Sequence, residues 1–146
     1  MKSARVWIVV ADGARARVYE RTGKGAAMTA IERMSLEEEH PRSSELGRDR
    51  PARVKESASP TKHGIEPGRD LHEAAEEEFI KRFSALLTAE WNRGSFDHVI
   101  LVAAPRALGY LRAALPSALR KVATAEFAKD MTRSKPEEIA SLIARE

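Results

Sequence analysis

Two hydrophobic patterns follow each other in the first third of the chain. Residues 6–11 form a continuous apolar run rich in β-branched side chains, which is typical of a strand buried on both faces. Asp12-Gly13 comes next and favours a two-residue hairpin turn, because both central positions of that turn need a positive φ. Residues 14–20 then alternate between apolar and polar, and a weaker strand is expected over residues 27–34. Together these segments predict an antiparallel meander of three strands.

The second half of the chain alternates between helical and strand-like patterns. Asp70 and Glu73 form a capping pair that opens a helix with apolar residues at helical spacing, and Gly94 ends this helix. A buried strand is predicted over residues 98–103, followed by a helix that begins at Pro105 and restarts at Pro116. Another strand is predicted over residues 122–127. The last helix has Pro136 in its first turn and is capped by the pair Ser134 and Glu137.

This order of elements predicts an α/β fold. Three antiparallel strands followed by alternating helices and strands give a mixed sheet covered by helices, in the order β-β-β-(long loop)-α-β-α-β-α. This is the element order of the ribonuclease H-like folds. The length of 146 residues fits a single α/β domain over residues 1–146.

A long polar segment over residues 40–72 interrupts this pattern. It lacks aromatic residues and holds few large apolar ones, so it buries too little surface to offset its ordering entropy. Loops of this length within a domain are usually functional or disordered. Its basic residues suit contact with RNA phosphates, although a solvated loop of mixed charge explains them equally well; they are Arg42, Arg48, Arg50, Arg53, Lys55, Lys62 and Arg69.

Overall composition narrows the function only slightly. The formal net charge of +3 allows an acidic partner such as RNA without requiring one. The absence of cysteine excludes disulfides, zinc ribbons and thiol nucleophiles. The apolar run near the N-terminus is too short for a signal peptide, and no segment approaches the length of a membrane span. We therefore expect a cytoplasmic protein with no membrane partner; its oligomeric state stays open.

Catalytic patterns are weak in this sequence. A two-metal nuclease of this fold needs carboxylates within the first strand and near the end of the fourth, yet residues 7–10 and 102–105 contain none. Asp12 is better explained by its hairpin turn. No nucleophile elbow and no phosphate-binding glycine motif is present. His98 opens a buried strand and is interpreted as a core histidine. We therefore favour a binding protein over an enzyme and predict no cofactor.

The end of the polar segment holds the remaining candidate site. Glycines, a proline and ionisable groups gather just before the predicted helix. His63, Glu66, Asp70 and His72 are metal-ligand types, but nothing in their spacing fixes a geometry, so no metal is predicted. The alternative is that Asp70 caps the helix and the others are solvated. The candidate functional residues here are His63, Gly64, Glu66, Pro67, Gly68, Arg69 and His72.

A second candidate phosphate contact lies on the predicted second strand. Arg15, Arg17 and Tyr19 share one face of residues 14–20. A plain exposed sheet face is the more common explanation of such a pattern. With the basic residues of the polar segment, the candidate RNA-binding set is Arg15, Arg17, Arg48, Arg50, Arg53, Lys55 and Lys62.

Four motifs in order resemble the bacterial host-attachment protein family. They are Trp7 to Arg17 (WIVVADGARAR), His63 to Pro67 (HGIEP), Phe96 to Gly109 (FDHVILVAAPRALG) and Lys129 to Thr132 (KDMT). The resemblance covers nearly the whole chain. It implies a role in attachment of plant-associated bacteria to host cells, which for a chain without an export signal is expected to be indirect.

That family in turn looks like the central domain of archaeal and eukaryotic-type peptide release factors, which has a ribonuclease H-like fold. In those factors a Gly-Gly-Gln loop precedes a long helix and reaches the peptidyl-transfer centre of the ribosome. The present sequence has no Gly-Gly-Gln and no glutamine. The resemblance therefore implies a loop that binds ribosome or tRNA, without hydrolysis by the release-factor mechanism.

Three functions follow as hypotheses. The leading one is an RNA- or ribosome-associated module acting in translation stress or rescue. The second is a protein-interaction module with an indirect role in attachment, whose loop docks on a protein partner. The third is a hydrolase that acts through His63 and Glu66 in the segment 63–72.

Overall fold

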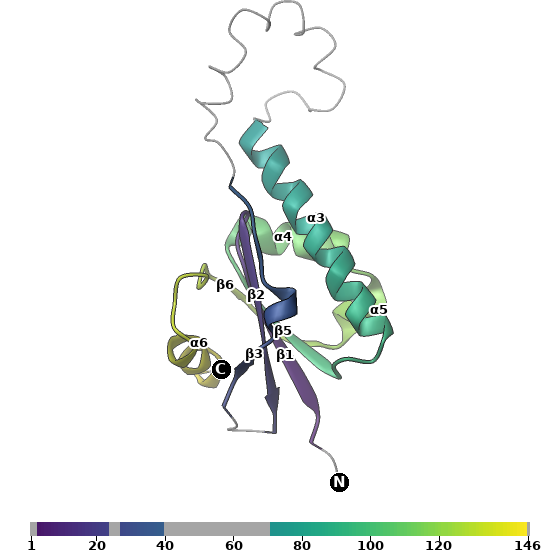
Figure 1. The fold of residues 1–146 in the computed structure, drawn as a ribbon, viewed down its shortest axis with the longest axis vertical. Coiled ribbons are helices and arrows are strands. Elements are labelled where there is room, and N and C mark those ends of the chain that lie inside the picture. Colours follow the sequence, from purple (N-terminus) through teal and green to yellow (C-terminus); the bar gives the residue numbers. More distant parts are fainter. Residues whose placement is uncertain (1–2, 24–26, 40–70, 146) are drawn as a thin grey trace, which may run out of the picture.

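The computed structural model describes residues 3–23, 27–39 and 71–145. The described strands are β1 (Arg5–Ala11), β2 (Arg15–Thr22), β3 (Thr29–Ala30), β4 (Leu36–Glu37), β5 (His98–Ala103) and β6 (Ala123–Ala128). The helices are the 3-10 turn η1 (Glu32–Met34), α3 (Leu71–Asn92), α4 (Pro105–Ala114), α5 (Ser117–Lys121) and α6 (Pro136–Ala144). Figure 1 shows their arrangement.

One mixed sheet organises these elements. Its strand order is β3-β2-β1-β5-β6, with β4 also paired to β2. β2 is antiparallel to β1, β3 and β4, whereas β5 runs parallel to both β1 and β6. The predicted mixed α/β fold is confirmed, and the order of strands and helices agrees with the ribonuclease H-like arrangement. Because β1, β5 and β6 are parallel, their carboxyl ends meet at one edge of the sheet.

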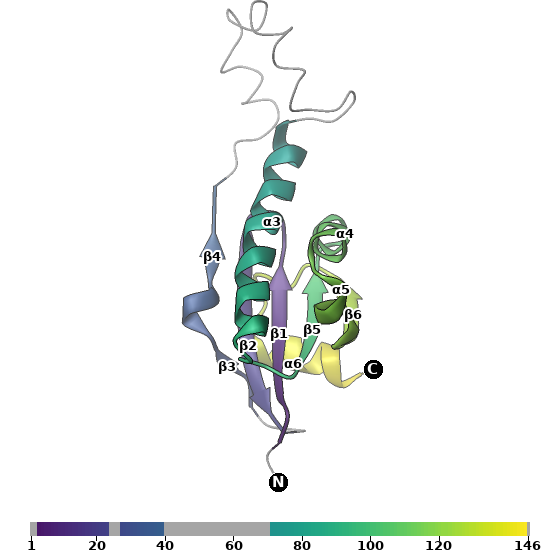
Figure 2. The same ribbon diagram turned by 90° about the vertical axis from the view of Figure 1, so that its right-hand side faces the viewer.

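Helices cover both faces of the sheet. Helices α3, α4 and α5 pack on one face, where Trp7, Val9 and Ala11 of β1 point. Helix α6 packs on the other face, where Ile139 meets Ile8 and Val10 of the same strand. Figure 2 shows α3 and α4 in front of the strands and α6 behind them. Residues 7–11 of β1 are at most 1% exposed, so the prediction of a strand buried on both faces is confirmed.

The hairpin after β1 differs from the predicted turn. Gly13 has no positive φ; among the described residues only Gly23 and Gly94 do. The turn is instead held by the Asp12 side chain, and β2 begins at Arg15 rather than at residue 14. A side-chain oxygen can satisfy the backbone N–H groups of a turn, which removes the need for a left-handed residue.

Three further predictions about the elements need correction. The strand expected over residues 27–34 is only β3, followed by η1 and β4. Leu71 and His72 belong to α3 and not to the polar loop, which was expected to reach residue 72. Helix α6 is capped at Lys135, where the backbone N–H donates to Glu138, so the predicted pair Ser134 and Glu137 is one residue early.

Two burial predictions are also wrong. Tyr19 is 5% exposed and belongs to the core beneath α6, so it does not share a solvated face with Arg17. The approach of α6 to this face could not be read from the alternation in β2 alone. His98 is exposed rather than a core histidine, because it is the first residue of β5 and lies at the sheet margin. No helix in the described part of the chain is long and apolar enough to cross a bilayer.

Candidate functional site

A cleft of about 840 Å³ lies at the carboxyl ends of the parallel strands. Asp12 follows β1, Ala104 follows β5 and Asp130 follows β6, so all three strands deliver residues to it. Ligands of open α/β sheets usually bind at this edge. We call it the carboxyl-edge cleft; its lining is Asp12, Gly13, Ala14, Arg15, Glu38, Glu39, His72, Glu76, Ala104, Pro105, Arg106, Ala107, Tyr110, Asp130 and Arg133.

Asp12 fixes the turn that forms one wall of the cleft. Its Oδ1 accepts hydrogen bonds from the backbone N–H groups of Ala14 and Arg15, both at 2.8 Å. The backbone N–H of Asp12 donates to the carbonyl of Arg15 at 2.9 Å. The interpretation of Asp12 as a turn residue therefore accounts for one oxygen of its carboxylate, and the other oxygen faces Thr132 and the guanidinium of Arg15.

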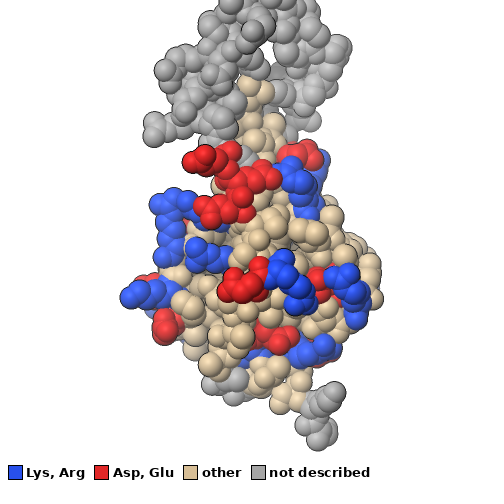
Figure 3. Space-filling model, in the orientation of Figure 1, with Lys and Arg blue, Asp and Glu red and all other residues tan. Residues whose placement is uncertain are grey.

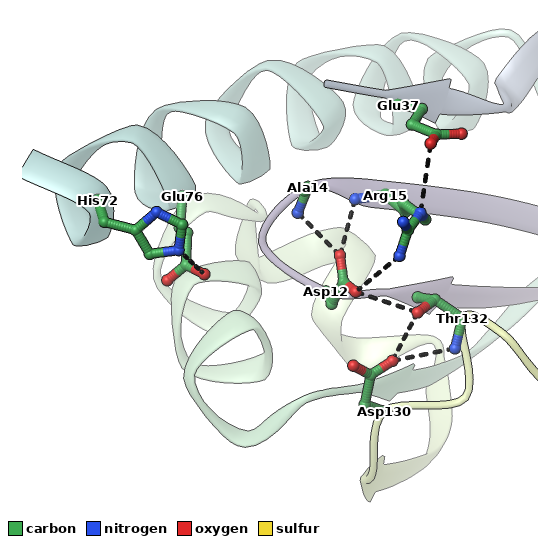
Figure 4. Close-up of polar contacts among 8 residues, drawn as sticks. All are labelled: Asp12, Ala14, Arg15, Glu37, His72, Glu76, Asp130 and Thr132. Atoms are coloured by element: carbon green, nitrogen blue, oxygen red, sulfur yellow. Dashed lines mark hydrogen bonds and ion pairs between the residues drawn. The ribbon is translucent and has the colours of Figure 1, made fainter. Parts of the chain in front are cut away.

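Thr132 joins this turn to the segment after β6. Its hydroxyl lies 3.0 Å from Oδ2 of Asp12 and 2.7 Å from Oδ1 of Asp130, and its backbone N–H donates to the same Asp130 oxygen. Figure 4 shows the Thr132 side chain between the two carboxylates. The Thr132 residue is 1% exposed. Because its hydroxyl carries one proton, it cannot donate fully to both carboxylates at once.

Glu76 connects α3 to α4 across the cleft. Its Oε1 accepts from the guanidinium of Arg106 at 2.9 Å, and its Oε2 lies 3.3 Å from Nε2 of His72. Gly13 leaves room for this side chain: a Cβ there would lie 2.5 Å from Cγ of Glu76. The glycine is therefore favoured by the close approach of the Glu76 side chain and not by its own φ angle.

The amino end of α4 also opens onto the cleft. Its N-cap, Ala104, supplies no side-chain hydrogen bond, and Pro105 occupies the first helical position. The backbone N–H groups of Arg106 and Ala107 consequently lack an intrahelical partner, as in the first turn of any α-helix. These groups lie beside the arginines of the cleft and favour a ligand atom that accepts hydrogen bonds.

Charges of both signs line the cleft. Its three arginines are Arg15, Arg106 and Arg133, and its five carboxylates are Asp12, Glu38, Glu39, Glu76 and Asp130. Arg15 is paired with Glu37 and Asp12, and Arg106 with Glu76 and Glu73. Glu38 is paired with Arg82, while Arg133 makes no ion pair within the described residues. In the space-filling view acidic and basic side chains are interspersed in the same way (Figure 3). No group of three or more His, Asp or Glu side chains in the described ranges could hold a metal ion.

The structure places three of the residues that sequence analysis selected. Arg15 and His72 line the cleft, His72 from the first turn of α3. Arg17 is exposed on β2 and does not line it. The other selected residues lie outside the described ranges: His63, Gly64, Glu66, Pro67, Gly68, Arg69, Arg42, Arg48, Arg50, Arg53, Lys55 and Lys62.

Sequence analysis missed the cleft residues contributed by β6 and the two helices. Asp130 and Thr132 follow the last strand, Arg106 opens α4, and Glu76 faces them from α3. One signal was available: Asp12 and Asp130 each follow a strand expected to run parallel to the other, so both belong at one edge. The hydroxyl contact across 120 residues has no counterpart in any local pattern.

The fold and the cleft define a class of protein: a mixed α/β sheet with a charged binding cleft at the carboxyl ends of its parallel strands. A family model described as "Protein required for attachment to host cells" matches residues 7–143, and the chain belongs to this family. An uncharacterized protein of Rickettsia prowazekii (strain Madrid E), RP470, is 36% identical over 62 residues. That match covers 42% of the present chain and 40% of the relative's length.

Proposed function

We propose that this host-attachment family protein is an RNA-binding module of the cytoplasm, and that RNA enters the carboxyl-edge cleft. The description of the family concerns attachment to host cells. An RNA-binding protein would affect attachment indirectly, through the expression of other proteins. The same proposal includes association with ribosomes or tRNA, which rests on the resemblance to release-factor central domains.

One observation carries the proposal: the cleft lies where the chain enters and leaves its basic segment. Glu38 and Glu39 come just before residues 40–70, His72 comes just after them, and all three line the cleft. The segment contains seven basic residues against five acidic ones. Its basic residues are therefore tethered at both ends to a cleft that already holds three arginines.

The chemistry of the cleft suits one or two nucleotides of RNA. Arginine guanidinium groups and free helix N–H groups bind phosphate oxygens. Carboxylates accept hydrogen bonds from sugar hydroxyls and from base amino groups, and Tyr110 adds an aromatic residue to the lining, the kind of side chain on which bases stack. A cleft with both kinds of group supports a ligand that carries both phosphates and hydroxyls.

The test is an RNA-binding titration of the full chain at several salt concentrations. We expect a short single-stranded RNA to bind more weakly as salt rises, because basic side chains displace counterions from phosphates. Substituting Arg50→Ala and Arg53→Ala together should weaken binding and reduce the slope of log affinity against log salt by about 1.4, or roughly 0.7 per phosphate contact.

A matched control removes the same charge elsewhere. Arg120→Ala with Lys121→Ala takes two adjacent cations from α5, which does not line the cleft. This double variant should bind RNA like the unmodified protein, apart from a small general loss of affinity. Binding that is absent, insensitive to salt, or equally weakened by both double variants would refute the proposal.

A further inference from the structure

We propose that the carboxyl-edge cleft takes the 3′-terminal nucleoside of an RNA with its free 2′,3′-diol, and rejects an end that carries a 3′-phosphate. This inference rests on the proposed function and adds which part of the RNA enters. Three observations support the inference: the size of the cleft, the sign of its charge and the number of its hydrogen-bond acceptors.

The size of the cleft suits a small ligand or a chain end. Its volume of about 840 Å³ lies within the roughly 300–1,000 Å³ that small-molecule sites occupy. The lining combines the aromatic residue Tyr110 of α4 with carboxylates and arginines, among them Asp130 and Arg133. A terminal nucleoside carries groups of the matching kinds: a base, a sugar and one phosphodiester.

The charge of the cleft disfavours a doubly charged phosphate. Five carboxylates face three arginines. Two of those arginines are already engaged, since Arg106 lies 2.9 Å from Glu76 and Arg15 lies 3.4 Å from Glu37. Arg133 remains for a single phosphodiester. A terminal monoester would add negative charge beside Glu39 and Asp130, which make no ion pair within the described residues, whereas Glu38 is paired with Arg82 outside the cleft.

A diol supplies hydrogen-bond donors to the carboxylates around Thr132. Thr132 presents one hydroxyl proton to two carboxylates, at 3.0 Å from Asp12 and 2.7 Å from Asp130. The second oxygen of Asp130 makes no hydrogen bond within the described residues. Two adjacent sugar hydroxyls provide two further protons, and hydrogen bonds to charged carboxylates are about twice as strong as neutral ones. The site is thus rich in acceptors and is complemented by a ligand with paired donors.

The experiment compares one RNA sequence with three different ends against the unmodified full chain. The RNAs carry a 5′ fluorophore and end in a 2′,3′-diol, in a 3′-phosphate or in a 2′,3′-dideoxy nucleoside. We expect the diol RNA to bind about tenfold more tightly than either of the others, the loss expected for one charge-assisted hydrogen bond. Equal affinities for the three ends would overturn the inference while leaving RNA binding intact, and no binding of any RNA would overturn both proposals.

A protein variant tests whether Asp130 is the group that reads the end. Asp130→Asn keeps the size of the side chain and removes its charge, and it should reduce the preference for the diol end about tenfold. The matched control is Glu137→Gln, which removes one carboxylate from the exposed first turn of α6 and should leave the preference unchanged. A diol preference that survives in Asp130→Asn would contradict the assignment of this residue.

Discussion

Among single residues, Glu90 shows how this protein stabilises a buried charge. Glu90 is 4% exposed, and its carboxylate accepts hydrogen bonds from Arg33 at 3.0 Å, Ser95 at 2.6 Å and Arg93. The bond from Arg33 is the largest cause that lowers the pKa of Glu90 from 4.5 to about 2, followed by the bond from Ser95. The same arginine lies over the Trp7 ring, so the carboxylate fixes η1 against the end of α3.

This arrangement makes stability depend on pH in a defined direction. A carboxylate whose pKa is lowered in the folded state stabilises the fold above its unfolded pKa, and that stabilisation is lost as pH falls from about 4.5 towards 2. The shift corresponds to at most about 3 kcal/mol. Because Arg33 and Arg93 are 60% and 66% exposed, water screens them, and about 1–2 kcal/mol is expected.

The substitution Glu90→Gln tests this account. Urea unfolding at about pH 7 should show a loss of about 1–2 kcal/mol relative to the unmodified protein. The difference should shrink at about pH 3, because below about 4.5 the carboxylate of the unfolded chain takes up a proton while the folded one stays ionised. Glu137→Gln, on the exposed first turn of α6, is the control and should change little. An equal loss at both pH values would show that the charge of Glu90 is not the cause.

At the scale of elements, the junction between the β1–β2 turn and α3 shapes the cleft. Gly13 brings the turn against Glu76, and that side chain in turn holds Arg106 at the start of α4. Three elements far apart in sequence therefore meet around one carboxylate. Moving this carboxylate changes the cleft without unfolding the sheet.

The substitution Gly13→Ala should displace Glu76, because the new Cβ would lie 2.5 Å from its Cγ and 2.6 Å from its Cδ. We expect a small loss of about 1 kcal/mol or less in thermal or urea unfolding, because the flexible end of the Glu76 side chain can move aside at the cost of its contact with Arg106. Gly109→Ala is the matched control: nothing lies within 4 Å of its Cβ, and alanine in mid-helix stabilises by about 0.5–1 kcal/mol. Equal effects of the two substitutions would contradict the close approach.

Patterns in the sequence predicted the long strands and helices more accurately than the turns and caps that join them. The apolar run 6–11 and the helical spacing after Leu71 gave β1 and α3 because burial sets those periods directly. The burial of Tyr19 was predicted wrongly because it depends on α6, which is distant in sequence. The turn at Asp12 and the cap of α6 are local, and there the sequence offers neighbouring alternatives: a glycine turn at Asp12-Gly13, and a capping pair one residue earlier at Ser134 and Glu137. The strand predicted over residues 27–34 is shorter than expected, as β3, and β4 was not predicted, because two residues carry no period.

At the scale of the whole molecule, charged side chains are spread over the surface, and the candidate functional residues lie at one edge of the sheet. Both faces of the sheet are covered by helices, which leaves the carboxyl ends of β1, β5 and β6 as the place where several elements converge. Asp12, Arg15 and His72 could be named from the sequence as residues of interest, but their meeting in one cleft follows only from the parallel sheet. Asp130 lines the same cleft and Thr132 supports it from beneath; both lie in the motif of residues 129–132, but nothing in that motif predicts their contact with Asp12.

The most direct test of RNA binding at this edge is photocrosslinking of the full chain to a single-stranded RNA that contains 4-thiouridine, followed by mapping of the modified peptides. The proposal predicts crosslinks on the peptide that contains Tyr110 and on residues 129–134, both lost on competition with unlabelled RNA. Crosslinks confined to the opposite edge of the sheet, near Arg5 and Thr22, or no specific crosslinks at all, would contradict it.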